Sequence, residues 1–201
     1  MGDLTANIPQ RAVHLCVDMQ RIFAPGGHWA TPWMSRVLPI VIGIVERAPE
    51  RTLFTRFITP STVTEAGGRW QRYYRKWSAV TREQMDETWL NLVPEFEQFV
   101  PPAAVFDRMT YSAFSDGRLH TWLRHRGTDT LIVSGSETDV CVLATVLAAV
   151  DHGYRVIIVE DALCSSSDKS HDALLELYRN RFDIQIELAS CGEVLERWKI
   201  D

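Results

Sequence analysis

The pattern that decides the fold is TLIVSGSETDVCVLATVLAAVDHGYRVIIVED, residues Thr130–Asp161. Its two ends, TLIVSG and RVIIVED, are short continuous apolar runs, which are typical of strands buried on both faces. Between them, Thr138–His152 has helical periodicity, and Gly153 stands where a helix C-cap is expected. A strand, a helix and a second strand at this spacing predict a parallel βαβ unit.

The same alternation continues outward along the rest of the chain. Further strands are predicted at four apolar runs: Ala12–Asp18, Arg51–Phe57, Ala103–Asp107 and Asp183–Ala189. Further helices are predicted at four periodic stretches: Trp33–Arg47, Asp116–Arg126, Asp168–Arg181 and Cys191–Trp198. We therefore expect residues 1–201 to form a single α/β domain. Its predicted architecture is a three-layer α-β-α sandwich around a doubly wound, mainly parallel sheet of about six strands.

Residues 58–102 interrupt this alternation and are expected to form an excursion beside the sheet. Connections of this length are usually functional. Within it lies a stretch that we call the aromatic–basic segment, residues 69–77. Its aromatic residues fall at helical spacing on one face, and most of its basic residues lie on the other. Two interpretations stay open: an amphipathic helix packed on the sheet or on another subunit, or a lid over an active site.

Composition places the chain among ordinary globular proteins, because 46% of its residues are apolar and 23% are charged. Its 21 basic and 26 acidic residues give a net charge of −5, which disfavours general nucleic-acid binding. The longest uncharged apolar run, Val140–Val150, is too short to span a bilayer, and the first ten residues lack signal-peptide features. The cysteines, Cys16, Cys141, Cys164 and Cys191, form no C-x-x-C pair. We therefore predict a cytoplasmic protein with reduced thiols and no membrane or nucleic-acid partner.

Three chemically active side chains follow separate predicted strands. Asp18 ends the first strand, Arg108 follows the third, and Cys141 begins the helix after the fourth. Ligands in open parallel sheets bind beyond the carboxyl ends of the strands, so these residues are expected to meet at one edge. A cap from Thr138 or Asp139 would place Cys141 in the first helical turn, where the helix dipole favours a thiolate. From the pattern alone, each of the three also fits a structural role in the core, in a turn or at the surface.

Four stretches of this sequence resemble the cysteine hydrolases of the isochorismatase-like superfamily, in its amidohydrolase branch. Asp18 in VDMQ is similar to the aspartate that follows the first strand of that family. SGSETDVCVLAT resembles the nucleophile motif G-x-x-T-x-x-C-V-x-x-T, and YSAF (Tyr111–Phe114) the motif after the family's triad lysine. DALCSSSDKSHDAL resembles a further family segment. The similarity extends from about Ala12 to Ala189.

The resemblance implies a role for each matching residue. Asp18 would be the general base and Cys141 the nucleophile. A cis peptide bond would join Ser136 and Glu137, and the N–H groups of Glu137 and Cys141 would face the developing oxyanion. The implied reaction is attack on a carbonyl carbon bonded to nitrogen, loss of ammonia or an amine, and hydrolysis of a thioester.

Arg108 is a departure from the family pattern, since it occupies the place of the triad lysine. Arginine keeps the positive charge but differs in bulk and geometry and does not release a proton. The alternative is therefore a catalytically weakened family member that acts as a binding or regulatory protein. A third interpretation is hydrolysis of a vinyl ether or an ester with the same three residues.

A second departure concerns metal. Nicotinamidases of the family carry a metal-binding D-x-H cluster after the second strand, where this chain has FTRFITPST. We therefore expect no metal and no cofactor, and a carbamoyl, ureido, maleamate or biuret-type substrate rather than nicotinamide. Six residues are predicted to bind the substrate: Phe23, Phe57, Trp70, Trp77, Tyr111 and Thr138. A homodimer or homotetramer is expected by the same resemblance.

Overall fold

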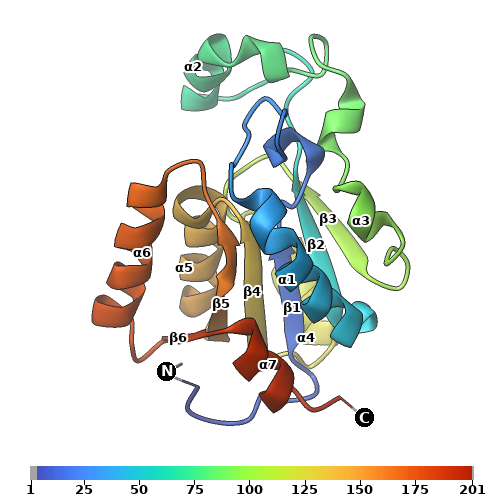
Figure 1. Cartoon of the computed structure of the whole chain (residues 1–201). Helices are drawn as coiled ribbons and strands as arrows, with labels where there is room; N and C mark the ends of the chain where they lie inside the picture. Colours follow the sequence, from blue (N-terminus) through green and yellow to red (C-terminus); the bar gives the residue numbers. More distant parts are fainter. Residues whose placement is uncertain (1–3, 201) are drawn as a thin grey trace.

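A six-stranded parallel sheet forms the centre of the computed structural model, which describes residues 4–200. Its strand order is β3-β2-β1-β4-β5-β6, and every neighbouring pair is parallel (Figure 1). The strands are β1 (Val13–Val17), β2 (Thr52–Phe57), β3 (Ala104–Arg108), β4 (Thr130–Ser136), β5 (Arg155–Cys164) and β6 (Ile186–Ala189). The order reverses between β1 and β4, which is where a doubly wound sheet opens a crevice.

Helices cover both faces of the sheet, which confirms the predicted three-layer α/β architecture (Figure 1). The helices are α1 (Met34–Arg47), α2 (Arg69–Lys76), α3 (Pro94–Glu97), α4 (Arg118–His125), α5 (Leu143–Asp151), α6 (Asp168–Arg181) and α7 (Cys191–Arg197). In the view of Figure 1, α1 and α7 lie in front of the sheet, and α4 and α5 lie behind it. No helix of the described residues is long and apolar enough to cross a membrane.

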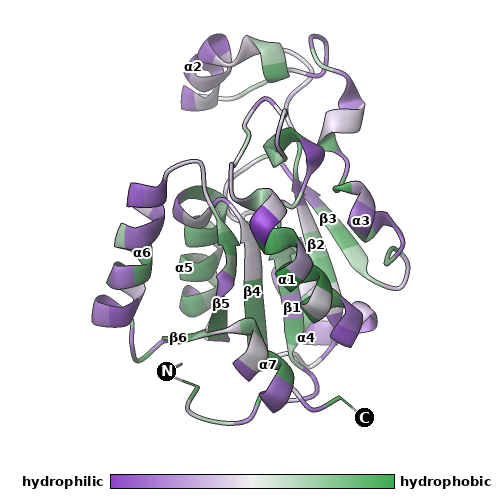
Figure 2. Cartoon of the chain, viewed as in Figure 1, coloured by the Kyte–Doolittle hydropathy of each residue, from purple (hydrophilic) through white to green (hydrophobic). Residues whose placement is uncertain are grey.

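The central strands are apolar because helices bury both of their faces. Every residue of β1 and β4 is buried, and Figure 2 shows that α5 is apolar along much of its length. His14 is a polar exception in β1: its Nε2 lies 2.7 Å from Ser134 Oγ, and its Nδ1 lies 3.3 Å from Thr52 Oγ1. Burial lowers the pKa of this imidazole to about 3, so His14 is neutral in the folded protein.

The stretch after β4 differs from its predicted form. The helix expected over Thr138–His152 begins as a π-helical turn, Thr138–Val142, and continues as α5. The predicted cap by Thr138 or Asp139 is wrong, because both side chains are engaged by the end of β5 and the chain after it. Thr138 Oγ1 donates to the Cys164 carbonyl at 3.1 Å, and Asp139 accepts a hydrogen bond from Ser165.

Two strand boundaries differ from their predicted positions by more than one residue. The predicted strand that ends at Asp161 extends to Cys164, because Cys164 pairs with Ser136 beside the end of β4. The last strand starts at Ile186 instead of Asp183. There a turn follows α6, in which the Phe182 carbonyl accepts from the N–H of Ile186 at 2.8 Å. Both differences lie at strand ends, where tertiary contacts decide the pairing.

Residues 58–102 lie over the carboxyl ends of the strands and along one side of the sheet (Figure 1). Gln20 fastens this connection to the rest of the molecule. Its amide Nε2 donates to the carbonyls of Leu90 at 2.7 Å and Phe57 at 3.1 Å, and its Oε1 accepts from the Phe57 N–H at 2.7 Å. The fully buried Gln20 therefore joins the loop after β1, the end of β2 and the connection.

Candidate active site

A buried ion pair joins the ends of β1 and β3. Asp18 directly follows β1, with a φ of 50° in the left-handed region, and Arg108 is the last residue of β3. Arg108 Nη2 donates to Asp18 Oδ2 at 2.6 Å, while the two side chains are 4% and 0% exposed. The two strands lie on either side of β2, so the sheet order itself brings together residues 90 positions apart.

Thr55 of β2 completes the environment of this carboxylate. Thr55 Oγ1 donates to Asp18 Oδ1 at 2.7 Å, and the Asp18 N–H donates to the Thr55 carbonyl at 3.2 Å. Both carboxylate oxygens of Asp18 therefore have a donor. Sequence reasoning missed Thr55, because it is one of several polar residues in the predicted strand Arg51–Phe57 and nothing local distinguishes it.

Cys141 lies in the π-helical turn after β4, and the peptide bond between Ser136 and Glu137 is cis. The thiol is buried, with 3% of the residue exposed. Burial and then the charge of Asp18 raise its pKa well above the usual range, and a hydrogen bond to Asp18 acts in the same direction. The Arg108 guanidinium opposes this shift. The direction of this shift favours a thiol over the expected thiolate, beside a carboxylate that can accept its proton.

A cavity of about 390 Å³ opens at Cys141. Its wall is largely aromatic, and its remaining lining includes His28, Glu137 and Ser166. The aromatic members are Phe23, Trp29, Phe57, Tyr73, Trp77 and Tyr111. A volume of this size suits a small-molecule ligand.

Four of the six residues predicted to bind substrate line this cavity: Phe23, Phe57, Trp77 and Tyr111. Trp70 and Thr138 do not. The Trp70 ring packs behind the wall against Tyr111, with ring centroids 4.7 Å apart. Thr138 is fully buried, and its Oγ1 lies 2.9 Å from His171 Nδ1 on α6.

Trp29, which sequence reasoning missed, is the centre of the aromatic wall. Its ring centroid lies 5.8 Å from that of Phe23, 5.9 Å from that of Phe57, and 6.2 Å from those of Tyr73 and Trp77. Trp29 lies in the loop between β1 and α1, where the sequence has no periodic pattern. The sequence feature that could have indicated Trp29 is its position in the loop that follows the first strand and Asp18.

The aromatic–basic segment forms α2 and contributes Tyr73 and Trp77 to the cavity wall. Tyr74 is buried behind them, and the remaining helical positions include four exposed cations, Arg69, Arg72, Arg75 and Lys76. Most of α2 is coloured as hydrophilic at the top of Figure 2. Of the two open interpretations, this arrangement favours a cover over the site.

The YSAF stretch is bonded to the helix that follows Cys141. Thr145 Oγ1 on α5 accepts a hydrogen bond from the Ala113 N–H at 3.1 Å, which connects the YSAF stretch to this helix.

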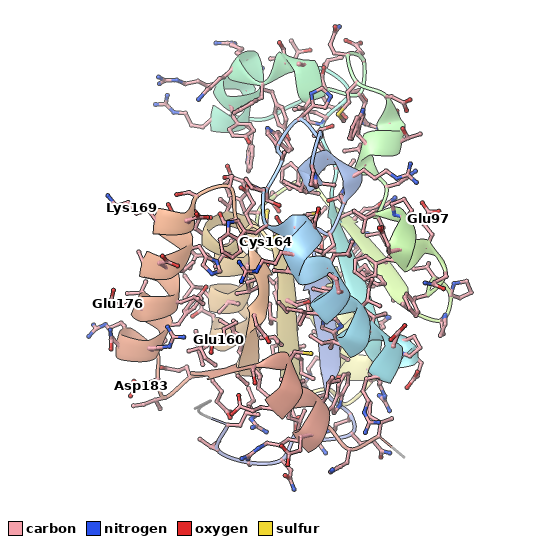
Figure 3. All side chains as sticks on the ribbon, viewed as in Figure 1. Glu97, Glu160, Cys164, Lys169, Glu176 and Asp183 are labelled. Carbon is pink, nitrogen blue, oxygen red and sulfur yellow. The ribbon has the colours of Figure 1, made fainter. Side chains whose placement is uncertain are left out.

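Cys164 lies at the carboxyl end of β5 (Figure 3), and burial raises the pKa of its thiol to about 11. Cys164 lines a neighbouring cavity of about 220 Å³, separate from the lining that contains Cys141.

The residues at this site do not fit a bound metal ion. Among residues 4–200, no group of three or more His, Cys, Asp or Glu side chains is placed to hold one. The stretch that leaves β2, Phe57–Ser61, offers no carboxylate or imidazole. His28 is the one imidazole among the described residues that line the cavity.

Comparisons with known proteins give a family match and several partial matches. A family model described as an isochorismatase domain matches residues 12–190. The maleamate amidohydrolase of Pseudomonas putida is 30% identical over 110 residues, 53% of this chain and 47% of that protein. The isochorismatase family protein YwoC of Bacillus subtilis is 34% identical over 87 residues, 40% of this chain and 46% of that protein. The chain thus spans about half the length of the curated relatives that it matches.

Solved structures show the same fold over almost the whole chain. A cysteine hydrolase from Pseudomonas syringae superposes with a TM-score of 0.83 at 22% identity, covering 95% of this chain and 93% of that one. An isochorismatase family protein from Desulfovibrio vulgaris superposes with a TM-score of 0.78 at 22% identity, covering 94% and 100%.

Proposed function

This chain belongs to the isochorismatase family, and from that premise we propose that it is a cysteine hydrolase. Its proposed reaction cleaves the C–N bond of a small amide, ureide or carbamoyl compound and releases ammonia or an amine. The observation that carries the proposal is the Asp18–Arg108 ion pair beside the Cys141 thiol, at a cavity of suitable size. The maleamate amidohydrolase among the relatives supports the reaction class.

Proton transfer from Cys141 to Asp18 starts the proposed reaction. The resulting thiolate attacks the carbonyl carbon, and the carbonyl oxygen takes the negative charge. In the proposal, the N–H groups of Glu137 and Cys141 donate to that oxygen, and each such donor is typically worth about 10²–10³ in rate. Asp18 returns the proton to the departing nitrogen, which leaves an acyl thioester on Cys141.

Water completes the proposed cycle. Asp18 takes a proton from a water molecule that attacks the thioester carbon, and the carboxylic acid leaves. The proton on Asp18 then returns to Cys141, which restores the resting thiol. Arg108 stays charged throughout, because guanidinium does not deprotonate in proteins, and it keeps the Asp18 carboxylate oriented by the 2.6 Å hydrogen bond. No step uses a metal ion.

An ammonia-release screen over amides, ureides and carbamoyl compounds tests this proposal. Wild type is expected to release ammonia or an amine from at least one class, and Cys141→Ala to lose this activity with its melting temperature retained. Cys191→Ala, at the start of α7 away from the cavity, is the matched control and is expected to keep the activity. Full activity in Cys141→Ala would overturn the proposal.

The second candidate, a binding or regulatory protein without turnover, is favoured by Arg108 at the triad lysine position. The screen separates the two, because the second candidate predicts amide binding without product in wild type. A cytoplasmic location is proposed on the cysteine pattern of the sequence, and a homodimer or homotetramer on the family resemblance. Light scattering of the purified protein tests the oligomeric state.

A further inference from the structure

The cavity at Cys141 has an unbalanced charge. Of the described residues that line it, Glu137 alone carries a carboxylate, and none is Lys or Arg. Glu137 enters no ion pair within residues 4–200, and its Oε1 accepts one hydrogen bond, from the Ser166 N–H at 3.2 Å. Burial raises the pKa of Glu137, and the negative charges of Asp139 and Asp18 raise it further.

Two cations lie beside residues of the cavity wall, and neither forms an ion pair with this carboxylate. Arg108 donates to Asp18 through Nη2 at 2.6 Å, and its guanidinium carbon lies 5.5 Å from the Phe57 ring centroid. Lys76 is exposed, with its Nζ 5.4 Å from the centroid of the Trp77 ring. Among the described residues that line the cavity, Glu137 is therefore the one acidic side chain, and no Lys or Arg lies beside it in the wall.

The aromatic wall acts in the same direction. Phe57 and Tyr111 stack with ring centroids 6.3 Å apart, and the Trp29 ring meets that of Trp77 edge-on at 6.2 Å. Aromatic faces carry a negative quadrupole, so they attract cations and disfavour anions. One carboxylate among several aromatic rings is a combination that recognises a flat, positively charged group.

We propose that Glu137 determines charge specificity, so that this site prefers amides with a cationic or neutral body and rejects amides that carry a carboxylate. The inference rests on the proposed amide hydrolysis. A second carboxylate placed in the cavity would meet the negative charge of Glu137, and none of the described lining residues is a Lys or Arg that could compensate it. The same repulsion acts on the product, since hydrolysis turns a neutral amide into a carboxylate that Glu137 helps to expel.

A matched set of three aromatic amides tests the proposal through kcat/KM for ammonia release: 3-carbamoyl-1-methylpyridinium (cationic), benzamide (neutral) and 3-carbamoylbenzoate (anionic). Wild type is expected to prefer the cation over the anion at least tenfold. Glu137→Gln should narrow this ratio about tenfold, and Glu137→Lys should invert the order. Glu176→Gln, on α6 and remote from the cavity (Figure 3), makes the same charge change and should leave the ratio as in wild type.

A binding measurement in Cys141→Ala keeps the test independent of turnover. Trp29 and Trp77 line the cavity, so quenching of tryptophan fluorescence reports ligand binding there. The pyridinium amide should bind at least tenfold more tightly than 3-carbamoylbenzoate, and lower pH should weaken this preference as Glu137 becomes protonated.

The outcomes separate this inference from the proposed function. If wild type hydrolyses the anionic amide as fast as the cationic one, the charge inference is overturned while the amidohydrolase proposal stands. Equal changes in Glu137→Gln and Glu176→Gln would also overturn it. If no amide in the screen is hydrolysed, the proposed reaction fails, and the fluorescence titration still decides the charge preference.

Discussion

Arg108 Nη2 lies 2.6 Å from Asp18 Oδ2, and neither side chain is appreciably exposed. The arginine makes this contact through a single nitrogen, while Thr55 donates to the other carboxylate oxygen. A single donor is also what a lysine ammonium can provide. If Arg108 stands in for the family's lysine, as the sequence resemblance implies, it makes the same kind of single contact with a different head group.

Two substitutions of Arg108 should show whether hydrolysis needs only its positive charge or also the shape of the guanidinium. Arg108→Met leaves the buried Asp18 carboxylate unpaired, which typically destabilises a protein by about 3–5 kcal/mol. We expect urea unfolding of Arg108→Met to show this loss of unfolding free energy, and kcat/KM for amide hydrolysis to fall at least a hundredfold. Arg108→Lys should stay within about tenfold of wild type in kcat/KM. If Arg108→Lys were as inactive as Arg108→Met, the geometry of the guanidinium would be essential.

Replacement of Asp18 should make Cys141 more acidic and the enzyme less active. Because the Asp18 charge raises the pKa of the Cys141 thiol, Asp18→Asn should shift the pH profile of Cys141 alkylation to lower pH. Loss of the general base should lower kcat by about 10²–10⁴. Iodoacetamide labelling followed by mass spectrometry of the Cys141 peptide measures the profile. A shift to higher pH would contradict the electrostatic picture of this pair.

Thr55 should act on the reaction through Asp18. Thr55→Val removes the donor to Asp18 Oδ1 and leaves a buried acceptor unsatisfied, at a cost of about 1–3 kcal/mol in unfolding free energy. We expect kcat to fall more than KM rises, because the general base is displaced rather than the cavity wall. Thr55→Ser, which keeps the hydroxyl, is the matched control and should recover most of kcat. Equal kcat in wild type, Thr55→Val and Thr55→Ser would show that Thr55 does not affect the reaction.

His14 should make the folded state sensitive to mild acid. Its pKa of about 3 lies below the ordinary value of 6.5, so the unfolded chain takes up a proton that the native state refuses. The resulting stability is present above pH 6.5 and is lost as the pH falls toward 3. Between pH 6.5 and 5 this one group should lower the unfolding free energy by up to about 1.4 kcal/mol per pH unit. Urea titrations of wild type and His14→Gln measure the two slopes, and identical slopes would refute this prediction.

The parts of the fold that sequence reasoning predicted depend on local repetition. Apolar runs such as Thr130–Gly135 and the periodic stretch Asp168–Arg181 specify buried strands and helices without knowledge of their neighbours, and the structure has both. The convergence of Asp18, Arg108 and Cys141 follows from strand order, so the rule for parallel sheets together with the motifs was sufficient to place them.

The remaining features of the site depend on contacts between distant segments. The raised pKa of Cys141 comes from burial by surrounding chain that no local pattern describes. Thr138 is turned away from the cavity because the end of β5 accepts its hydrogen bond, and the length of β5 was itself a tertiary effect. Trp29 and Thr55 acquire their roles from partners in other elements, so their types alone did not mark them.

The cavity wall draws on two parts of the chain. Most of its aromatic residues lie at or after the ends of strands, as Asp18, Arg108 and Cys141 do, whereas Tyr73 and Trp77 belong to the connection between β2 and β3. That connection can change in length and side chains without a change in the register of the sheet. A graft of this connection from a relative would therefore replace one part of the cavity wall while the strand ends and their side chains stay in place.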